Sequence, residues 1–218
     1  MAAENYYNKY WRKEVDGKST HTPPTWDEDN LRWHYSFFKK YMGENILDVG
    51  AGDGTFLNFL LSKRNRKISK AIASELSEQA ISIGREKFPE LEFKKESLEK
   101  LSFKNHSFDT IFAIEVVEHL LDIDLCLSEI SRVLKPGGYF CVTTTDFNLP
   151  KKIIIAGLFW NRFFYPNNPH IRFFTKSTLS DICLKHGLKL VDYRWNRSYF
   201  GLMPKGQMVV FQKVDIIE

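Results

Sequence analysis

Three glycines and a carboxylate lie together where an apolar segment of the chain ends. Residues 46–56 read ILDVGAGDGTF, so that Asp48 stands two residues before the first of three glycines spaced G-x-G-x-G. Glycines in such a turn let the backbone bend tightly and approach a ligand closely. The spacing differs from the G-x-G-x-x-G that binds the pyrophosphate of a dinucleotide. Asp48 would repel a pyrophosphate, so the turn favours a ligand that carries positive charge.

Short apolar runs alternate with helical patterns on both sides of this turn. The alternation predicts repeated βαβ units, and therefore an α/β, doubly wound, Rossmann-like fold with a mostly parallel sheet. The sequence Lys135-Pro136-Gly137-Gly138 is a stop signal for the helix before it. Seven strands are expected at residues 45–49, 70–74, 91–94, 108–114, 138–144, 189–196 and 207–213, with core helices at residues 55–63, 77–87, 124–133 and 175–185.

The composition excludes several classes of protein. Of the 218 residues, 43% are hydrophobic and 27% are charged, which excludes a disordered, collagen-like or coiled-coil chain. The longest apolar run, residues 153–160, is far shorter than the roughly 20 residues of a membrane-spanning helix. The first residues lack the pattern of a secretory signal, so we expect a cytoplasmic protein. Three cysteines, Cys126, Cys141 and Cys183, form no CxxC pair and are expected to be buried free thiols.

Charge is distributed unevenly along the chain. Residues 1–150 contain 20 basic and 23 acidic side chains, whereas residues 151–218 contain 11 basic and 4 acidic ones. The overall net charge of +4 is too small to indicate a nucleic-acid partner by itself. The basic last third could favour an anionic substrate or a membrane surface, or it could be a solvated face.

The glycine turn and two later segments resemble the class I S-adenosylmethionine-dependent methyltransferases. LDVGAGDGTF matches that family's apolar strand, acidic residue and G-x-G-x-G turn, and FDTIFAIEVVEHLLD resembles its fourth-strand segment. ISRVLKPGGYFCVTT is similar to the next helix, turn and strand. The resemblance covers residues 45–145 and implies S-adenosyl-L-methionine as cofactor. It also implies a seven-stranded sheet whose last strand is antiparallel.

The same resemblance implies which residues hold the cofactor. Asp48 and Gly50 to Gly52 would lie near its methionine part, and Glu75, 21 residues beyond Gly54, would accept its ribose hydroxyls. After the third strand the family usually has Asp near the adenine amino group, where this chain has Glu96. The implied cofactor-binding residues are Asp48, Gly50, Ala51, Gly52, Glu75, Leu76, Glu96, Ser97, Leu98 and Glu115.

We expect one methyltransferase domain over residues 1–218. It would consist of an N-terminal helical cap (1–43), a cofactor-binding core (44–146), an aromatic insertion or lid after the fifth strand (147–174) and a C-terminal helix with strands (175–218). Within the cap, helices are expected at residues 5–14 and 27–42, on either side of a polar segment at 16–25. Thr175 and Gly187 are the expected start and stop residues of the C-terminal helix.

Residues 108–195 resemble, more narrowly, the small-molecule branch that includes the ubiquinone-biosynthesis O-methyltransferases and enzymes that modify sugars, polyketides and lipids. This likeness implies transfer to an oxygen, with nitrogen left open. The chain has neither the Asp/Asn-Pro-Pro-aromatic motif of DNA amino-methylating enzymes after its fourth strand nor a Pro-Cys nucleophile. A DNA substrate is therefore not expected, and a small-molecule or lipid-linked acceptor is.

A hydroxyl acceptor must lose a proton, and His170 or His119 could take it. Each could instead be structural, and Glu115 and Glu118 carry the same ambiguity. No spacing of His, Cys, Asp and Glu predicts a metal site.

Aromatic residues on both sides of the core could close over the site, or could pack as ordinary core. They are Tyr6, Tyr7, Tyr10 and Trp11 before the core, and Phe159, Trp160, Phe163, Phe164 and Tyr165 in the insertion. Residues 151–165 also fit a peripheral membrane contact, because two lysines precede an apolar run with an arginine behind it. Two alternatives stay open, an RNA or protein methyltransferase and a noncatalytic cofactor-binding module. The oligomeric state is not predicted.

Overall fold

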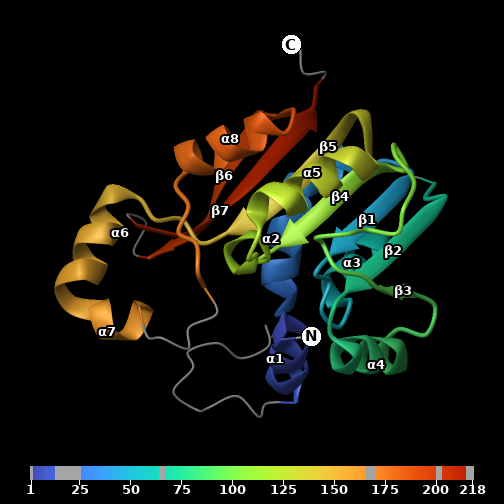
Figure 1. Ribbon diagram of the computed structural model, residues 1–218, viewed down its shortest axis with the longest axis horizontal. Helices are drawn as coiled ribbons and strands as arrows, with labels where there is room; N and C mark the ends of the chain where they lie inside the picture. Colours follow the sequence, from blue (N-terminus) through green and yellow to red (C-terminus); the bar gives the residue numbers. More distant parts are fainter. Residues whose placement is uncertain (1, 13–25, 64–66, 165–169, 200–202, 215–218) are drawn as a thin grey trace.

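A seven-stranded sheet forms the centre of the molecule (Figure 1). The computed structural model describes residues 2–12, 26–63, 67–164, 170–199 and 203–214. The strand order is β3-β2-β1-β4-β5-β7-β6, and only β7 runs antiparallel to its neighbours. The strands are β1 (Asn45–Val49), β2 (Lys70–Glu75), β3 (Glu92–Lys95), β4 (Phe108–Ile114), β5 (Leu134–Thr144), β6 (Leu188–Tyr199) and β7 (Met203–Lys213). The predicted doubly wound fold with an antiparallel last strand is confirmed.

Helices cover both faces of the sheet, because successive residues of the central strands point to opposite sides. On β1, Leu47 and Val49 join the core beneath α5 and α8, whereas Ile46 joins the core beneath α2 and α3. The helices are α1 (Ala2–Trp11), α2 (Glu28–Phe38), α3 (Thr55–Ser62), α4 (Glu78–Lys87), α5 (Ile123–Val133), α6 (Leu149–Ile154), α7 (Trp160–Phe163) and α8 (Lys176–Lys185). Short 3₁₀ turns occur at Lys39–Tyr41 (η1) and Val117–His119 (η2). A π-helical turn, Ile155–Phe159 (η3), joins α6 to α7.

Most predicted boundaries agree with the structure within a few residues, and the largest differences have local causes. Lys135-Pro136-Gly137-Gly138 ends α5 at Val133 as expected, but β5 already begins at Leu134. The register between β4 and β5 shifts there, and Gly137 has a positive φ of 74°, so the Gly-Gly pair forms an irregularity within the strand. Thr175 is the N-cap of α8 with a reciprocal capping box, as predicted. The polar segment predicted at 16–25 lies outside the described residues.

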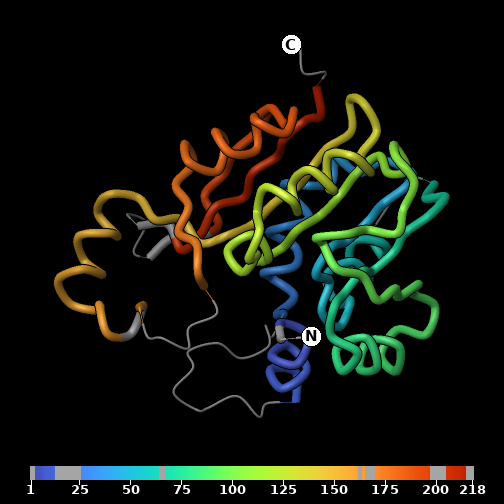
Figure 2. Tube along the Cα trace, viewed as in Figure 1, coloured from blue at the N-terminus to red at the C-terminus, as the bar shows by residue number. Residues whose placement is uncertain are grey.

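The insertion after β5 leaves the sheet and returns to the same point. Asp146 and Phe174 form an isolated parallel bridge, and the Phe147 N–H donates to the Phe174 carbonyl at 2.9 Å. Between these ends, α6 and α7 extend beside the β6–β7 hairpin (Figure 1). Helix α1 lies apart from them, near the carboxyl ends of β1 and β2 (Figure 2). All three cysteines are buried and free. Among the described residues, no helix is long and apolar enough to cross a membrane.

Candidate active site

The glycine turn between β1 and α3 adopts a backbone that requires glycine. Gly50, Gly52 and Gly54 have φ values of 64°, 57° and 76°, in the left-handed region that side chains disfavour. A Cβ on Gly50 would lie 2.7 Å from Cγ2 of Val116, and a Cβ on Gly52 would lie 2.6 Å from Cζ2 of Trp11. The turn is therefore packed between η2 and α1, and its glycines are needed for both conformation and space.

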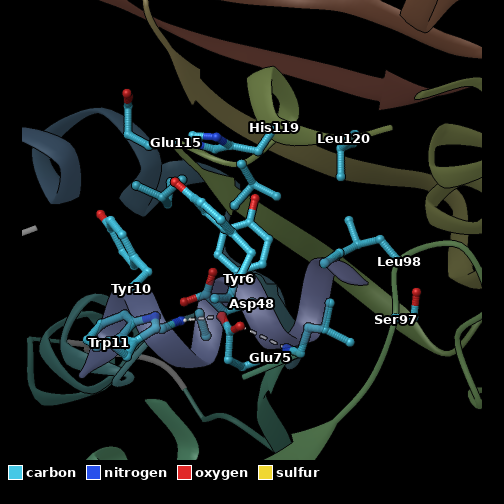
Figure 3. A pocket seen from close by; sticks show the side chains of 18 of the residues that line it. Tyr6, Tyr10, Trp11, Asp48, Glu75, Ser97, Leu98, Glu115, His119 and Leu120 are labelled. Atoms are coloured by element: carbon cyan, nitrogen blue, oxygen red, sulfur yellow. Dashed lines mark hydrogen bonds between the residues drawn. The ribbon is translucent and has the colours of Figure 1, made fainter. Parts of the chain in front are cut away.

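Glu75, at the end of β2, holds this turn through its carboxylate (Figure 3). Oε2 accepts the N–H of Gly52 at 2.9 Å, and Oε1 accepts the N–H groups of Leu76 at 2.8 Å and Ser77 at 2.9 Å. Burial raises the pKa of Glu75, and the three backbone hydrogen bonds oppose that rise without cancelling it. The carboxylate thus fixes the loop while facing the pocket.

Asp48 is a second buried carboxylate at the same edge, only 1% exposed. Burial raises the pKa of Asp48 well above its ordinary range, and the nearby carboxylate of Glu75 raises it further. Two buried acids side by side are costly unless they are protonated or meet a cation. A ligand with an ammonium or sulfonium group fits this charge arrangement.

A pocket of about 360 Å³ lies over these residues, at the carboxyl ends of β1, β2 and β4. Pockets of roughly 300–1,000 Å³ hold small ligands in other proteins. Side chains of α1 form one wall, as Figure 3 shows for Tyr6, Tyr10 and Trp11. Burial raises the pKa of Tyr7 and Tyr10, so both phenols remain neutral hydrogen-bonding groups. The aromatic residues of α1, for which the sequence left both a covering and a core role open, thus line the pocket.

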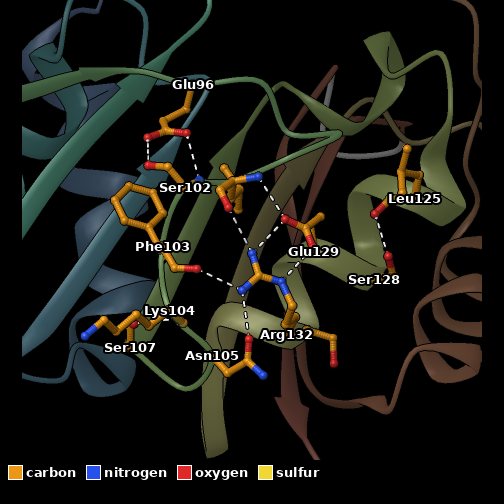
Figure 4. Close-up of polar contacts among 12 residues, drawn as sticks. Glu96, Ser102, Phe103, Lys104, Asn105, Ser107, Leu125, Ser128, Glu129 and Arg132 are labelled. Carbon is orange, nitrogen blue, oxygen red and sulfur yellow. Dashed lines mark hydrogen bonds and ion pairs between the residues drawn. The ribbon is translucent and has the colours of Figure 1, made fainter.

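Nine of the ten predicted cofactor-binding residues line this pocket. They are Asp48, Gly50, Ala51, Gly52, Glu75, Leu76, Ser97, Leu98 and Glu115. The structure does not bring Glu96 to it, because the Glu96 carboxylate accepts hydrogen bonds from the N–H and hydroxyl of Ser102 (Figure 4). Glu99, two residues past Ser97, lines the pocket instead and was not predicted. Trp26, Phe56 and Cys126 are further lining residues that were not among the predicted site residues.

A side-chain network behind the pocket holds the segment that follows β3. Arg132 donates to the carbonyls of Leu101 at 3.0 Å and Phe103 at 2.8 Å, and pairs with Glu129 at 2.7 Å (Figure 4). Glu129 in turn accepts the N–H of Leu101 at 2.8 Å. Helix α5 thereby positions the loop that presents Ser97 to the pocket.

His119 and His170, the two candidate bases, meet at the other end of the pocket. Their ring centroids are 4.6 Å apart, and both residues line the cavity. His119 ends η2, whereas His170 precedes Ile171 and Arg172, whose N–H groups donate to the Glu118 carbonyl at 3.1 and 3.2 Å. These two backbone hydrogen bonds hold the returning insertion against η2 and so place His170 beside His119.

Glu118 lies behind the histidines and is 1% exposed. Its Oε1 is 3.9 Å from Nε2 of His170. Burial raises the pKa of Glu118 well above its ordinary range, and the adjacent Glu115 carboxylate adds to the rise. Burial also raises the pKa of Glu115, whose φ of 55° is unusual for a non-glycine residue and is typical of functional sites. Side-chain ligand atoms of Glu118, His119 and His170 all lie within 4.8 Å of one another, a grouping that sequence spacing did not predict.

The aromatic side chains of the insertion do not join this pocket in the described part of the chain. Phe159, Trp160 and Phe164 are exposed, and His170 is the insertion's described contribution to the lining. The side chain of Phe163 and residue Tyr165, also predicted to close over the site, lie outside the described residues. Phe159, Trp160 and Phe164 stay away from the pocket because α6 and α7 extend sideways from the point where β5 ends (Figure 1).

Fold and pocket together define a doubly wound enzyme with an acidic, glycine-lined site for a cationic cofactor. Residues 18–193 match the sequence profile of a family described as a methyltransferase domain. The chain belongs to this methyltransferase family. S-adenosyl-L-methionine is its cofactor, and the acidic pocket fits the ammonium and sulfonium charges of that molecule.

Individual relatives share about 30% of their residues with this chain over parts of its length. A ubiquinone biosynthesis O-methyltransferase of Chelativorans sp. is 31% identical over 129 residues, which are 56% of this chain and 49% of that protein. A demethylmenaquinone methyltransferase of Bacteroides fragilis is 29% identical over 150 residues, 62% of this chain and 59% of the relative. The chain thus spans between about half and three fifths of these curated relatives.

A solved structure shows the same fold at lower identity. It is the Burkholderia thailandensis 1,6-didemethyltoxoflavin-N1-methyltransferase with bound 1,6-didemethyltoxoflavin and S-adenosylhomocysteine. The TM-score is 0.66 at 16% identity, over 97% of this chain and 86% of that one.

Proposed function

We propose that this methyltransferase transfers the methyl group of S-adenosylmethionine to an oxygen of a small-molecule, sugar or lipid-linked metabolite. The observation that carries the proposal is the meeting of His119 and His170 at the pocket end opposite Glu75, with Glu118 behind them. A hydroxyl acceptor needs a base, whereas a neutral amine can be methylated before it loses its proton. The name of the Chelativorans relative supports oxygen as the acceptor atom.

In the proposed mechanism, S-adenosylmethionine supplies a methyl group already activated by its positively charged sulfur. Asp48 would hold the cationic end of the cofactor, Glu75 would accept its ribose hydroxyls, and Ser97 and Leu98 would border its base. The α1 rings would exclude water from the reacting groups and stabilise the sulfonium charge. Most of the acceleration would come from holding the acceptor oxygen about 3–3.5 Å from the methyl carbon.

His170 is the favoured base, because its Nε2 faces the Glu118 carboxylate at 3.9 Å. An ionised Glu118 would stabilise the imidazolium that forms when His170 takes the hydroxyl proton. His119, whose ring packs edge-on against Tyr7 with centroids 6.4 Å apart, would orient the acceptor beside it. Glu118 is so deeply buried that its pKa is raised, and proton uptake by His170 and ionisation of Glu118 are therefore expected to be linked.

The test is methyl transfer to paired acceptors that differ only in the reacting atom. Purified protein with methyl-labelled cofactor is incubated with matched phenols and anilines, sugar alcohols, isoprenoid-linked phenols, DNA, RNA and a protein extract. We expect label in the hydroxyl compounds, identified by mass spectrometry, and none in DNA. Label only in RNA or protein would support the alternative of an RNA or protein methyltransferase instead. Tight cofactor binding with no transfer to any acceptor would support a noncatalytic module.

A further inference from the structure

The insertion exposes an apolar surface that the rest of the described chain leaves uncovered. Among the described side chains of α6, η3 and α7, the most exposed large residues are Leu158 at 76%, Leu149 at 69%, Ile153 at 65%, Trp160 at 57% and Phe159 at 45%. We call these five residues the insertion face. Single exposed apolar residues are common, but several gathered within one short helical segment indicate an interaction surface.

The orientation of Leu149 and Ile153 in the insertion face is fixed by residues on the opposite side of the helix. Lys151 and Ile155 are only 5% and 4% exposed and lie four residues apart, so they share the inward side of the helix. The Lys151 ammonium donates to the Lys205 carbonyl of β7 at 2.9 Å and lies 5.3 Å from the Phe147 ring centroid. α6 is thus docked through Lys151 and Ile155 and presents Leu149 and Ile153 outward, and the other three residues of the insertion face follow in η3 and α7, where they are exposed.

Charge around the insertion face has a single sign. Residues 147–180 contain five basic side chains and no Asp or Glu. Lys152 and Lys176 are exposed, whereas Arg172 is engaged by the Leu120 and Leu121 carbonyls at 2.9 and 2.6 Å. An apolar surface bordered by cations is complementary to a lipid layer with anionic headgroups.

We propose that the insertion face docks this protein onto the surface of an anionic lipid bilayer. α6 has six residues and α7 four, so the segment would lie within the interface with Trp160 at headgroup depth. A second copy of the chain is the less favourable occupant, because it would bring two all-basic segments together.

Docking would also place the pocket mouth near lipid. The insertion returns from the insertion face to His170, which lines the pocket. A lipid-linked acceptor could then reach the histidines directly from the bilayer. That consequence rests on the proposed function, but the docking itself does not.

The experiment measures sedimentation of the 218-residue chain with vesicles, without cofactor or acceptor. Vesicles of phosphatidylcholine alone are compared with vesicles containing one third phosphatidylglycerol. We expect binding to the anionic vesicles that weakens as salt is raised, and much weaker binding to the neutral ones. The Leu158→Glu/Trp160→Glu variant should bind at least about tenfold more weakly, since two apolar anchors are lost. Lys152→Gln should weaken binding by about fivefold, the effect of one basic residue near such a surface.

Matched controls lie on α8, away from the insertion. Leu184 is 55% exposed and Lys185 is exposed, so Leu184→Glu and Lys185→Gln repeat the chemical changes at another place. Both should bind vesicles as the wild type does, and thermal unfolding should show all variants folded. Absence of binding to anionic vesicles, or equal binding by Leu158→Glu/Trp160→Glu, would overturn the proposal. So would a wild-type dimer in sedimentation velocity that this variant converts to monomer, because a second copy would then cover the face.

Discussion

Replacing Glu75 with glutamine removes the carboxylate that holds the glycine turn through backbone hydrogen bonds. Its two oxygens accept three backbone N–H groups, one from Gly52 on one side and those of Leu76 and Ser77 on the other. Glutamine keeps the shape but offers a single oxygen, so its NH₂ group must face a backbone N–H in either orientation. The orientation that keeps the two bonds to Leu76 and Ser77 leaves the conflict at Gly52.

The expected magnitude follows from those contacts. A hydrogen bond to a charged group contributes about 1.5–3 kcal/mol, and a buried donor left without a partner costs about 1–3 kcal/mol. In Glu75→Gln, the Gly52 N–H loses its hydrogen bond to the carboxylate, and the ribose hydroxyls lose the charged acceptor proposed for them. We therefore expect cofactor affinity to fall by about 10- to 100-fold. The cofactor-free protein should lose only about 1–2 kcal/mol of unfolding free energy, because removing a buried charge offsets part of the loss.

Calorimetry with S-adenosylmethionine and S-adenosylhomocysteine measures this change. Glu96→Gln is the control, because the Glu96 carboxylate binds Ser102 and does not line the pocket. We expect its affinity to stay within about twofold of wild type, well below the tenfold that 1.4 kcal/mol represents. Wild-type cofactor affinity in Glu75→Gln would refute the role of the Glu75 carboxylate in holding the glycine turn and the cofactor. An equal loss of cofactor affinity in Glu96→Gln would show that the adenine side of the site is placed wrongly.

Three further predictions concern the same pocket. Because burial raises the pKa of Asp48, the acid must give up its proton when the cationic cofactor binds, so affinity should rise with pH through that raised pKa and calorimetry in two buffers should detect proton release. His170→Ala should lower kcat by about 10²–10⁴ while cofactor affinity holds, with His119→Ala affecting mainly the KM for the acceptor, and equal wild-type rates in both would exclude a histidine base. Gly50→Ala should weaken cofactor binding, since its Cβ would meet Val116 at 2.7 Å, whereas Gly157→Ala has nothing within 4 Å and should bind normally.

The family resemblance implied the residues on the cofactor side of the site, and these residues come together in one pocket because the geometry of this part is local. The glycine turn, Asp48 and Glu75 all stand directly at the ends of apolar strands, and parallel strands bring such ends to one edge. Glu96 shows the limit of this reasoning. Its position after β3 was predicted correctly, but its side chain turns to Ser102 because α5 holds the following loop in place through Arg132. The direction of a side chain after a strand depends on such distant contacts.

The acceptor side could not be predicted in the same way, because its parts are far apart in sequence. His119 and His170 are 51 positions apart, and they meet only because the N–H groups of Ile171 and Arg172 bind the Glu118 carbonyl. Backbone hydrogen bonds of this kind carry no residue signature. The burial of Lys151 was also not predictable from local sequence, because it depends on a hydrogen bond to the carbonyl of Lys205, 54 positions away.

The short segment from Glu115 to His119 connects the two halves of the site. Val116 packs against Gly50 on the cofactor side, while the backbone carbonyl of Glu118 holds the insertion on the acceptor side. Changes within the insertion can therefore alter what reaches His170 without disturbing the glycine turn, since the two contacts lie on different residues of η2 and its N-cap. In this chain, the contact with the glycine turn and the contact with the insertion are thus made by different residues of one short segment.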